Sequence, residues 1–452
     1  MKINSKTKIG ILGLGITGIS IYNYLTKKYA SNIVCFDDKK EICEKFTKKY
    51  TQTKIISLEN DTWKKLEIIF ISPGIRTSHE IFHIANENNI PIYSDIDLFY
   101  KENPNSFFIC ITGSNGKTTT TNLLKKIFED KKLNFACGGN IGIPILELEQ
   151  NKDFYLLEVS SFQANLLKEL KPKISVLLNL LPNHLDVYQS IEEYIKDKKT
   201  LLTRSEIKII GINNDISKNI YEYYKSQQSS SAINLISFNN EKDYKFQADF
   251  SIKENILKDN FLDFEEYIFQ LGNYILNPNI ILSSYIVAKL LNISIENFFD
   301  SFKNFHPPKY RLEFLGKKSN ISFFNDSKST NTSATSFALS CLDDVLLIIG
   351  GIFKEENCKI LEKKLHKIKK AFIIGKETRI FENFFKGKKI NYELSGSLEK
   401  AFQNAIFFAK NLSNATILLS PASASFDQFH NFEHRGAIFS NLVNNFLYET
   451  NI

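Results

Sequence analysis

Residues 111–124, ITGSNGKTTTTNLL, place a lysine and a threonine directly after a glycine, between an apolar segment and a threonine-rich segment. A strand that runs into a glycine turn and then a helix exposes backbone N–H groups at the start of the helix, where the helix dipole favours anions. Gly113 and Gly116 would let the backbone approach a phosphate closely, Lys117 can neutralise phosphate oxygens, and the hydroxyl of Thr118 suits Mg²⁺. The spacing therefore predicts a loop that holds nucleotide phosphates.

This predicted phosphate loop departs from the usual pattern G-x-x-x-x-G-K-[ST] at one position, because Ile111 stands where the first glycine is expected. The alternative is an ordinary connection between a strand and a helix. We favour the phosphate loop because an apolar segment precedes it and a helical pattern follows it. Nucleotide binding is assigned to Gly113, Ser114, Asn115, Gly116, Lys117, Thr118 and Thr119.

A second glycine loop, GLGITG at 13–18, follows a short apolar segment near the N-terminus. With Asp37, about 20 residues further on, it fits the dinucleotide-binding pattern G-x-G-x-x-G plus an acid. That pattern predicts an oxidoreductase that uses a nicotinamide or flavin, and the alternative is a tight turn between a strand and a helix. A dehydrogenase has no need of a Gly-Lys-Thr loop, so the two loops together weigh against a dinucleotide site.

Two further residues could bind a metal ion. Glu158 ends one apolar segment, and His184 lies in LLPNHLDVY just beyond another. Ligands of parallel sheets collect at the carboxyl ends of strands, so Thr118, Glu158 and His184 could meet at one cation. Mg²⁺ prefers oxygen ligands and keeps several waters, so one carboxylate and one hydroxyl are a normal protein set. A single histidine is as readily a hydrogen-bonded core or loop residue, and that alternative stays open for His184.

Two segments near the C-terminal end are dense in hydroxyl groups. They are NDSKSTNTSAT at 325–335 and SPASASFDQFHNFEHRG at 420–436, and each follows an apolar segment. Loops of this composition can bind carboxylates or phosphates, and the alternative is a capped loop before a helix. Two such loops in one part of the chain favour a binding site.

Apolar segments alternate with helical patterns along most of the chain, which is typical of parallel sheets covered by helices on both faces. The predicted strands form three series, at 8–12, 33–38, 67–75 and 90–99, at 107–113, 154–162, 174–180 and 207–213, and at 321–326, 345–351, 370–376 and 415–421. ENPNS at 102–106 and the double proline in FHPPKYRLEF at 305–314 separate the series. The polar stretch 229–274 predicts an antiparallel addition.

The composition narrows the class of protein. With 452 residues the chain needs more than one domain, and 43% apolar and 24% charged residues predict a folded protein. The net charge of +7 comes from lysines interleaved with acids, so no stripe for nucleic acid is expected. No apolar segment approaches the roughly 18 residues of a membrane helix. The six cysteines show no metal-binding spacing and suit reduced thiols, which predicts a cytoplasmic protein.

The motifs in combination resemble those of a known family. TGSNGKTTT, GGNIGIP (Gly138–Pro144), LEVSSFQ, NHLD, NDSKSTN and SPASASFDQFHNFEHRG occur in the order found in the Mur ligases, the ATP-dependent amide-forming enzymes of peptidoglycan precursor synthesis. The resemblance covers almost the whole chain and is weakest at 229–274. The last two motifs look like those of the branch that adds D-glutamate.

The resemblance implies an α/β fold of three domains. The first, at 1–95, would be a Rossmann-like parallel sheet that binds the uridine-diphosphate part of a substrate. The second, at 96–306, would be a P-loop ATPase-like domain that binds ATP. The third, at 307–452, would be Rossmann-like, bind the amino acid and close the cleft. The implied cofactors are ATP and Mg²⁺, and the implied partners are UDP-N-acetylmuramoyl-L-alanine and D-glutamate, with no nucleic acid, no membrane and a monomeric enzyme.

The resemblance also implies roles for particular residues. Lys117 and Thr118 match the phosphate and Mg²⁺ positions, and Glu158 and His184 match metal positions. Lys198 matches a lysine that this family carbamylates, which would make it an anionic ligand for a second Mg²⁺. Taken without the resemblance, Lys198 in the run KDKK would be a solvated helix lysine.

The remaining implied contacts are assigned by position. Those to the uridine part are Gly15, Ile16, Thr17 and Asp37. Those to the substrate near the metal are Asn140, Ser161 and Gln163. Further nucleotide contacts are Asn277, Arg311, Asp326 and Lys328. Those to D-glutamate are Thr330, Lys354, Ser425, Phe426 and Phe432.

Three positions depart from the family pattern. Asn183 stands where an Asp often precedes the histidine, LNPN at 276–279 replaces the usual His-Asn pair, and GGIFK at 350–354 lacks the acid often found before its lysine. These departures put the adenine contacts in question. The alternatives that stay open are a related amide ligase such as a folylpolyglutamate synthase, a nicotinamide-dependent oxidoreductase, and a nucleotide-binding module without catalysis.

Overall fold

The computed structural model describes residues 2–29, 32–140, 142–181, 188, 190–227, 234–241, 244–253, 256–260, 265–268, 276–355 and 357–448. The chain forms two compact units, one made of Met1–Leu180, Glu192–Ile268 and Leu282–Phe302, the other of Leu181–Ile191, Phe269–Ile281 and Lys303–Ile452. The first unit holds two sheets and the second holds one. In the described part of the chain, no helix combines the length and the apolar character needed to cross a membrane.

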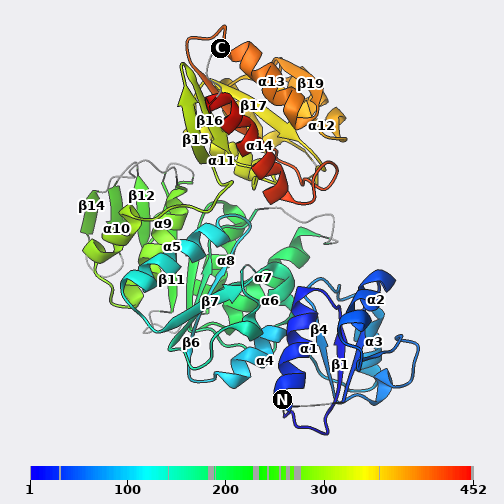
Figure 1. Ribbon diagram of the computed structural model, residues 1–452. Coiled ribbons are helices and arrows are strands. Elements are labelled where there is room, and N and C mark those ends of the chain that lie inside the picture. Colours follow the sequence, from blue (N-terminus) through cyan, green and yellow to red (C-terminus); the bar gives the residue numbers. More distant parts are fainter. Residues whose placement is uncertain are drawn as a thin grey trace. The chain divides into compact units, whose positions relative to one another are not determined.

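The first sheet has five parallel strands in the order β3-β2-β1-β4-β5 (Figure 1, blue). β1 and β4 lie at its centre and are almost wholly buried, which explains their unbroken apolar sequences. The elements are β1 (Lys8–Leu12), α1 (Ile16–Tyr29), β2 (Asn32–Phe36), α2 (Lys40–Lys49), β3 (Lys54–Ile55), η1 (Trp63–Lys65), β4 (Ile68–Ile71), α3 (Glu80–Glu87), β5 (Ile92–Tyr93) and α4 (Asp95–Glu102).

The second sheet has nine strands in the order β14-β13-β12-β11-β10-β9-β6-β8-β7. Its elements are β6 (Phe107–Thr112), α5 (Lys117–Asp130), β7 (Phe135–Gly139), η2 (Ile145–Glu147), β8 (Phe154–Glu158), α6 (Ser161–Leu166), β9 (Ile174–Leu177), α7 (Ile191–Arg204), β10 (Ile207–Gly211), α8 (Asp215–Ser226), β11 (Leu235–Asn240), β12 (Phe250–Lys253), β13 (Ile256–Asp259), β14 (Glu265–Ile268), α9 (Pro278–Leu290) and α10 (Ile295–Lys303). The strands from β7 to β12 are parallel, while β13 and β14 are antiparallel to their neighbours. The expected antiparallel addition is thus present, although it begins only after β12.

The register of this sheet brings three strand ends together. Ile111 of β6 pairs with Glu158 of β8 on one side and with Val176 of β9 on the other. Because these strands are parallel, the segments that leave their carboxyl ends emerge at the same edge of the sheet. The phosphate loop after β6 therefore starts beside Glu158.

The third sheet, in the second unit, has six strands in the order β15-β16-β20-β17-β18-β19. β15 and β16 form an antiparallel hairpin, and the remaining pairs are parallel. The elements are β15 (Glu313–Lys318), β16 (Ile321–Asn325), α11 (Thr332–Cys341), β17 (Val345–Gly350), η3 (Lys359–Lys367), β18 (Ile368–Ile374), α12 (Thr378–Gly387), β19 (Tyr392–Gly396), α13 (Leu398–Ala409), β20 (Ala415–Leu419) and α14 (Phe432–Tyr448).

One predicted strand is largely a helix. The segment 90–99 was expected to be a strand, but only Ile92–Tyr93 pairs in the sheet, and α4 begins at Asp95. Ser94 caps this helix, because its hydroxyl accepts a hydrogen bond from the N–H of Asp97 at 3.1 Å. Two acids in the first turn also suit the helix dipole, so the capping signal outweighs the apolar pattern.

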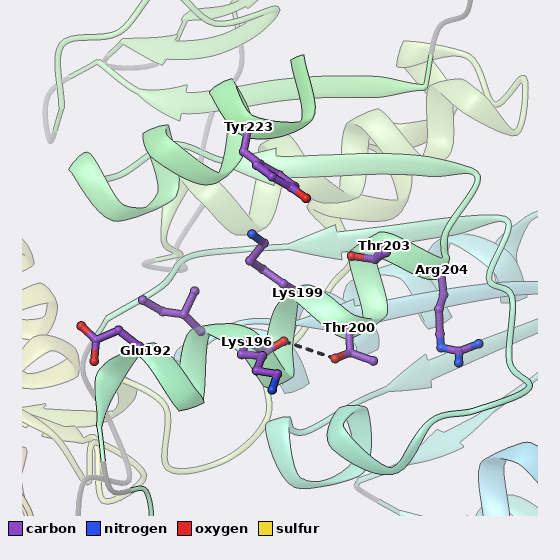
Figure 2. A pocket seen from close by; sticks show the side chains of 8 residues that line it. Glu192, Lys196, Lys199, Thr200, Thr203, Arg204 and Tyr223 are labelled. Carbon is purple, nitrogen blue, oxygen red and sulfur yellow. Dashed lines mark hydrogen bonds between the residues drawn. The ribbon is translucent and has the colours of Figure 1, made fainter. Parts of the chain in front are cut away.

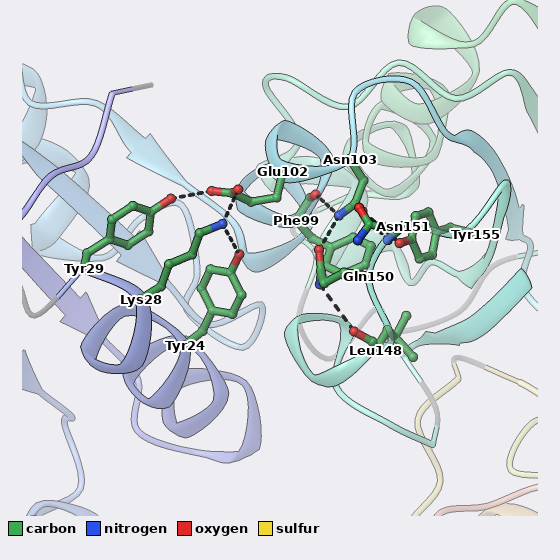
Figure 3. A network of polar contacts seen from close by, with 10 residues as sticks. All are labelled: Tyr24, Lys28, Tyr29, Phe99, Glu102, Asn103, Leu148, Gln150, Asn151 and Tyr155. Atoms are coloured by element: carbon green, nitrogen blue, oxygen red, sulfur yellow. Dashed lines mark hydrogen bonds and ion pairs between the residues drawn. The ribbon is translucent and has the colours of Figure 1, made fainter.

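A polar network joins α1 of the first sheet to β8 of the second through α4 (Figure 3). Lys28 and Tyr29 of α1 both donate hydrogen bonds to the carboxylate of Glu102 at the end of α4. The next residue, Asn103, accepts a hydrogen bond from the hydroxyl of Tyr155 on β8 at 2.8 Å. The polar segment that was expected to separate the two series of strands is therefore tied to both of them.

Asp97 makes a second link between α4 and the nine-stranded sheet. Its side chain is fully buried, and its carboxylate accepts hydrogen bonds from the backbone N–H groups of Lys168, Glu169 and Leu170 at 2.8 to 3.2 Å. Those three residues follow α6. One buried carboxylate thus satisfies three N–H groups that would otherwise need another acceptor.

We expect Asp97→Ala to lower the free energy of unfolding by about 3 kcal/mol, because it leaves buried N–H donors without their acceptor. Urea unfolding can be followed by the fluorescence of Trp63, which is the only tryptophan and lies fully buried in η1 against β1 of the first sheet. Asp61→Ala is the matched control, since the Asp61 side chain is 71% exposed. A change at Asp97 no larger than the change at Asp61 would contradict this prediction.

Candidate active site

The phosphate loop has the backbone that its sequence predicts. β6 ends at Thr112 and α5 begins at Lys117. Gly113 and Gly116 have φ angles of +149° and +88°, a region that favours glycine. Gly116 occupies the N-cap position of α5, so the first N–H groups of the helix lie next to the turn. This is the geometry in which a helix start binds an anion.

Asn179 holds the phosphate loop in place, and the sequence analysis missed it. Its backbone carbonyl accepts a hydrogen bond from the N–H of Ser114 at 3.1 Å. Its side chain accepts from the N–H of Asn115 at 2.9 Å and donates to the carbonyl of Asn115 at 3.0 Å. Asn179 lies just after β9, so the signal was a polar residue inside the apolar run LLNLL at a strand end.

Two lysines converge on the carbonyl oxygen of Gly113. Nζ of Lys117 donates to it at 2.8 Å and also donates to the carbonyl of Ser114 at 3.1 Å. Nζ of Lys198, which comes from α7, donates to the same Gly113 oxygen at 3.1 Å and to Oγ1 of Thr112 at 3.3 Å. The amine of Lys198 on α7 thus contacts the loop in addition to the amine of Lys117.

The environment of Lys198 differs from that of a surface lysine. Only 2% of its surface is exposed, so the expectation of a solvated helix lysine, formed without the family resemblance, is wrong. Burial lowers the pKa of Lys198 well below its usual value, and the charge of Lys117 lowers it further, while Asp197 and Glu158 oppose the shift. A larger share of this amine is therefore neutral than in water.

Tyr194 is a second residue that the sequence analysis did not assign. Its hydroxyl is hydrogen-bonded to Oγ of Ser114 at 2.9 Å, and its ring centroid lies 5.0 Å from Nζ of Lys198. Tyr194 and Lys198 are four residues apart on α7, so they share one face of that helix. Both therefore contact the phosphate loop from the same side.

Glu158 offers a buried carboxylate beside the loop. Its Oε1 accepts a hydrogen bond from Nδ2 of Asn140 at 2.9 Å, while Oε2 is buried and forms no hydrogen bond with any residue that the structure describes. Such an oxygen suits a hard cation. Among the described residues, no group of three or more His, Cys, Asp or Glu side chains is placed to hold a metal ion. The predicted ligand His184 lies outside the described residues, as does Asn183.

Ser161 and Gln163 lie at the start of α6, directly after β8. Gln163 closes a capping box with Ser160, since its side chain accepts from the N–H of Ser160 at 3.0 Å and its own N–H donates to Oγ of Ser160 at 3.2 Å. Ser161 is buried. The structure thus gives Gln163 a local structural role in addition to its predicted substrate contact.

The predicted uridine contacts lie together at the turn between β1 and α1. Gly15 and Ile16 are exposed and Thr17 is half-buried. The carboxylate of Asp37 accepts a hydrogen bond from the N–H of Leu14 at 2.7 Å, so Asp37 fixes the turn from the neighbouring strand end. A side chain at Gly15 would meet no atom within 4 Å, so the turn is open at that position.

In the second unit, the buried residue Asp326, which directly follows β16, accepts hydrogen bonds from three separate segments. Its carboxylate accepts hydrogen bonds from the hydroxyls of Ser329 and Ser420, the latter at 2.7 Å, and from the N–H of Leu312 at 3.0 Å. Burial raises the pKa of Asp326 to about 6, and these hydrogen bonds and the charge of Arg311 oppose the rise. Asp326 therefore connects the loop after β16 with the loop after β20.

The predicted D-glutamate contacts lie on these loops and their neighbour. Ser425 is buried, Phe426 is 66% exposed, and Thr330, Lys354 and Phe432 are half-buried. Phe432 is the first residue of α14, and the other four come from the loops after β16, β17 and β20. These three strands are parallel neighbours, so their carboxyl ends share one edge of the sheet.

Three predicted nucleotide contacts also lie in the second unit. Lys328 places its Nζ 3.7 Å from the centroid of the Phe432 ring, a cation–π contact. Arg311 is half-buried in the segment before β15. Oδ1 of Asn277 accepts a hydrogen bond from the N–H of Asn279 at 2.9 Å at the start of α9, so Asn277 has a role in that turn.

A hollow of about 590 Å³ lies on the outer face of α7, next to Tyr223 of α8 (Figure 2). Figure 2 shows Lys199 pointing toward Tyr223, and its Nζ lies 3.9 Å from the centroid of that ring. The described residues that line the hollow are Glu192, Ile195, Lys196, Lys199, Thr200, Thr203, Arg204 and Tyr223. None of these residues was predicted as a site residue, and none of them makes the hydrogen bonds to the phosphate loop that are described above.

Comparison with family models and known proteins agrees with this arrangement. The model described as "Mur ligase middle domain" matches residues 111–276, and the one described as "Mur ligase MurD-like, N-terminal domain" matches residues 7–94. Among solved structures, the MurF ligase of Thermotoga maritima in complex with ADP superposes with a TM-score of 0.59 at 15% identity, covering 98% of this chain and 96% of that one. The UDP-N-acetylmuramate–alanine ligase of the same organism gives a TM-score of 0.56 at 13% identity, covering 98% and 100%. These two similarities confirm the predicted three-domain α/β fold.

Sequence relatives are closer. The UDP-N-acetylmuramoylalanine–D-glutamate ligase of Rickettsia bellii is 37% identical over 451 residues, which covers 98% of this chain and 99% of the relative. The protein of the same name from Wolbachia pipientis is 32% identical over 495 residues, covering 97% of each chain. The chain therefore belongs to the Mur ligase family, in the branch of the UDP-N-acetylmuramoylalanine–D-glutamate ligases.

Proposed function

We propose that the protein joins D-glutamate to UDP-N-acetylmuramoyl-L-alanine, driven by ATP and through an acyl phosphate. Its near full-length relatives carry the name of this reaction. The structural observation that carries the proposal is the pair of amines from Lys117 and Lys198 at the carbonyl of Gly113, beside the buried carboxylate of Glu158. This arrangement supports transfer of a phosphoryl group at the phosphate loop.

The reaction must first overcome the repulsion between two anions. The substrate carboxylate has to approach the triphosphate of ATP, and each unscreened like-charge pair at 4 Å costs about 4 kcal/mol at an effective dielectric constant near 20. Lys117 and the N–H groups at the start of α5 can offset this cost, because they point charge and dipoles at the loop where phosphate binds. Their role is mainly electrostatic, and no covalent nucleophile of the protein is needed.

The chemistry then proceeds in two steps. An oxygen of the L-alanyl carboxylate attacks the γ-phosphorus of ATP, so a carbon-bound oxygen gains the phosphoryl group and ADP leaves. The amine of D-glutamate next attacks the acyl carbon, phosphate leaves, and the amine loses a proton as the amide forms. Because water would hydrolyse the acyl phosphate, the site must exclude it during the reaction.

The residues near the loop fit a magnesium ion. The hydroxyl of Thr118 and Oε2 of Glu158, which has no hydrogen-bond partner among the described residues, are oxygen donors of the kind that Mg²⁺ prefers. When bound, Mg²⁺ would neutralise charge on the phosphate oxygens. Asn140 would hold the Glu158 carboxylate in position through its hydrogen bond to Oε1. His184 stays a predicted ligand.

We also propose that Lys198 carries a carbamate, as the family resemblance implies. Carbon dioxide reacts with a neutral amine, and the depressed pKa of Lys198 makes that form more accessible. The neutral amine forms an N–C bond with the carbon of carbon dioxide and releases one proton, so the side chain changes from a neutral amine to an anion; a second proton is released where the side chain starts as the ammonium cation. The anion could then bind a cation near Thr112 and Gly113, which Nζ contacts now.

The other assignments stay predictions. We propose domain boundaries at 1–95, 96–306 and 307–452, with uridine binding at the β1–α1 turn and D-glutamate binding at the loops of the third sheet. The separation of the three sheets along the chain supports these boundaries. We propose a cytoplasmic monomer, and the six free cysteine thiols fit a reducing compartment.

The decisive test of function is phosphate release from ATP in the presence of UDP-N-acetylmuramoyl-L-alanine, with and without D-glutamate. Release that depends on D-glutamate supports the proposal, whereas release that depends on L-glutamate, glycine or a diamino acid would favour a related ligase. Micromolar binding of NAD(H) without affinity for ATP would favour the oxidoreductase instead.

We expect Lys117→Ala to lower turnover by about a hundredfold or more while the fold stays intact, because the loop loses a cation that faces the phosphates. Steady-state phosphate release measures the loss, and circular dichroism checks the fold. Lys125→Ala on the same helix is the control, since the Lys125 side chain is 47% exposed and pairs only with Glu129 at 3.7 Å among the ion pairs of the described residues. Near-normal turnover of Lys117→Ala would remove the phosphate-loop assignment.

For Lys198→Ala we expect a comparable loss that added acetate or formate partly restores, because a small carboxylate can replace the carbamate. Activity against carboxylate concentration is the measurement. Lys199→Ala is the matched control, because Lys199 lies on the same helix but lines the outer hollow. If Lys198→Ala alone keeps full activity, the carbamate proposal fails.

A further inference from the structure

Arg435, which the sequence analysis did not assign, is a fully buried arginine that connects separate segments of the second unit. Its Nε donates to Oγ of Ser327 at 3.0 Å, and its Nη2 donates to the carbonyl of Ser327 at 2.8 Å and to the carbonyl of Ser423 at 3.1 Å. Ser327 and Ser423 are 96 residues apart in sequence. One guanidinium therefore holds two loops at a fixed separation.

These two loops carry residues that we assign to D-glutamate. The loop after β16 contains Ser327 and, three residues later, Thr330. The loop after β20 contains Ser423 and, two residues later, Ser425. Any change in the separation of Ser327 and Ser423 would therefore move Thr330 relative to Ser425.

The same contacts also fix the start of α14. Oγ of Ser327 donates to the carbonyl of Phe432, the first residue of that helix, at 2.9 Å, while it accepts from Nε of Arg435. Nδ2 of Asn325 donates to the carbonyl of Gly436 at 2.8 Å, which ties the first turn of α14 to the end of β16 a second time. Phe432, another predicted D-glutamate contact, is thus positioned by the same cluster.

A role in stability alone does not account for a charge at this place. Burying a guanidinium carries a large desolvation cost, and well-packed apolar residues often replace buried ions without loss of stability. The carboxylates of Asp427 and Asp326 act on Arg435 and raise its pKa, which opposes the lowering caused by burial. What an apolar side chain could not supply is the planar set of donors that reaches Ser327 twice and Ser423 once.

We propose that Arg435 is a positioning residue for the amino-acid substrate: by joining the loops after β16 and β20 to α14, it sets the geometry of the residues that bind D-glutamate. The inference rests on the proposed function, because it assumes that these loops bind D-glutamate. It assigns no contact between Arg435 and the substrate. Its effect should therefore fall on the affinity for D-glutamate and leave the binding of the other two substrates largely unchanged.

The test is Arg435→Lys in the full-length enzyme, with KM measured separately for D-glutamate, ATP and UDP-N-acetylmuramoyl-L-alanine. Lysine keeps the charge but cannot reproduce the fork of donors, so the two loops lose their fixed separation. We expect KM for D-glutamate to rise about tenfold or more, which corresponds to about 1.4 kcal/mol, and the other two KM values to change less than about threefold.

Two further variants separate positioning from general loss of stability. Ser327→Ala removes the hydroxyl that bridges Arg435 and Phe432 without touching a charge, and we expect a smaller, about threefold rise in KM for D-glutamate alone. Phe439→Leu disturbs the packing of the same helix in the apolar core, where Phe439 is fully buried, and makes none of these contacts. It should lower the melting temperature without a selective change in KM for D-glutamate.

The outcomes distinguish this inference from the proposed function. A wild-type enzyme whose ATP turnover does not respond to D-glutamate defeats the proposed function itself. A D-glutamate-dependent wild type combined with unchanged or equally raised KM values in Arg435→Lys defeats only the positioning role. If Arg435→Lys does not fold, Ser327→Ala decides, because an unchanged KM for D-glutamate in that variant also overturns the inference.

Discussion

The candidate active site depends on the placing of two lysine amines against one carbonyl oxygen. Lys117 reaches Gly113 from the helix that follows the loop, and Lys198 reaches it from α7. Two ammonium groups this close repel each other strongly where they are buried, and this repulsion lowers the pKa of a lysine in such a pair. Lys198 is the more deeply buried of the two, and burial lowers its pKa well below the usual value. The lowered pKa of Lys198 therefore follows from its burial and from the nearby charge of Lys117.

The register of the nine-stranded sheet brings together the residues around the Gly113 carbonyl. The pairing of Ile111 with Glu158 and Val176 places the ends of β6, β8 and β9 at one edge, where Gly113, Glu158 and Asn179 follow. Asn179 then fixes the loop with three hydrogen bonds, and Tyr194 contacts it from α7. A shift of one residue in this register would turn every side chain of the affected strand to the opposite face.

Much of this could be predicted from local patterns. The strand at Lys8–Leu12, the phosphate loop and the position of Glu158 follow from apolar segments and glycine turns that are contiguous in sequence. Asn179 and Tyr194 were missed because they act through contacts with residues 64 and 80 positions away in sequence. The polar residue inside LLNLL was a local signal for Asn179, but it did not identify the partner. The prediction of a strand at 90–99 was wrong for a different reason. Its apolar residues fit a buried helix face as well as a strand, and N-capping by Ser94 favours the helix.

Lys198 and Arg435 show how two buried cations can serve different purposes. Burial lowers the pKa of Arg435 to about 9 while Asp427 and Asp326 oppose the shift, so the guanidinium still carries its charge near neutral pH and can maintain hydrogen bonds to fixed acceptors. Burial and the nearby charge of Lys117 lower the pKa of Lys198, and an amine gives up its proton far more readily than a guanidinium. Exchanging the two side chain types would defeat both sites, since a lysine could not span Ser327 and Ser423, and an arginine would keep a positive charge beside Lys117. Burial lowers the pKa at both places and carboxylates oppose it at both, so the type of side chain decides which cation keeps its proton more firmly.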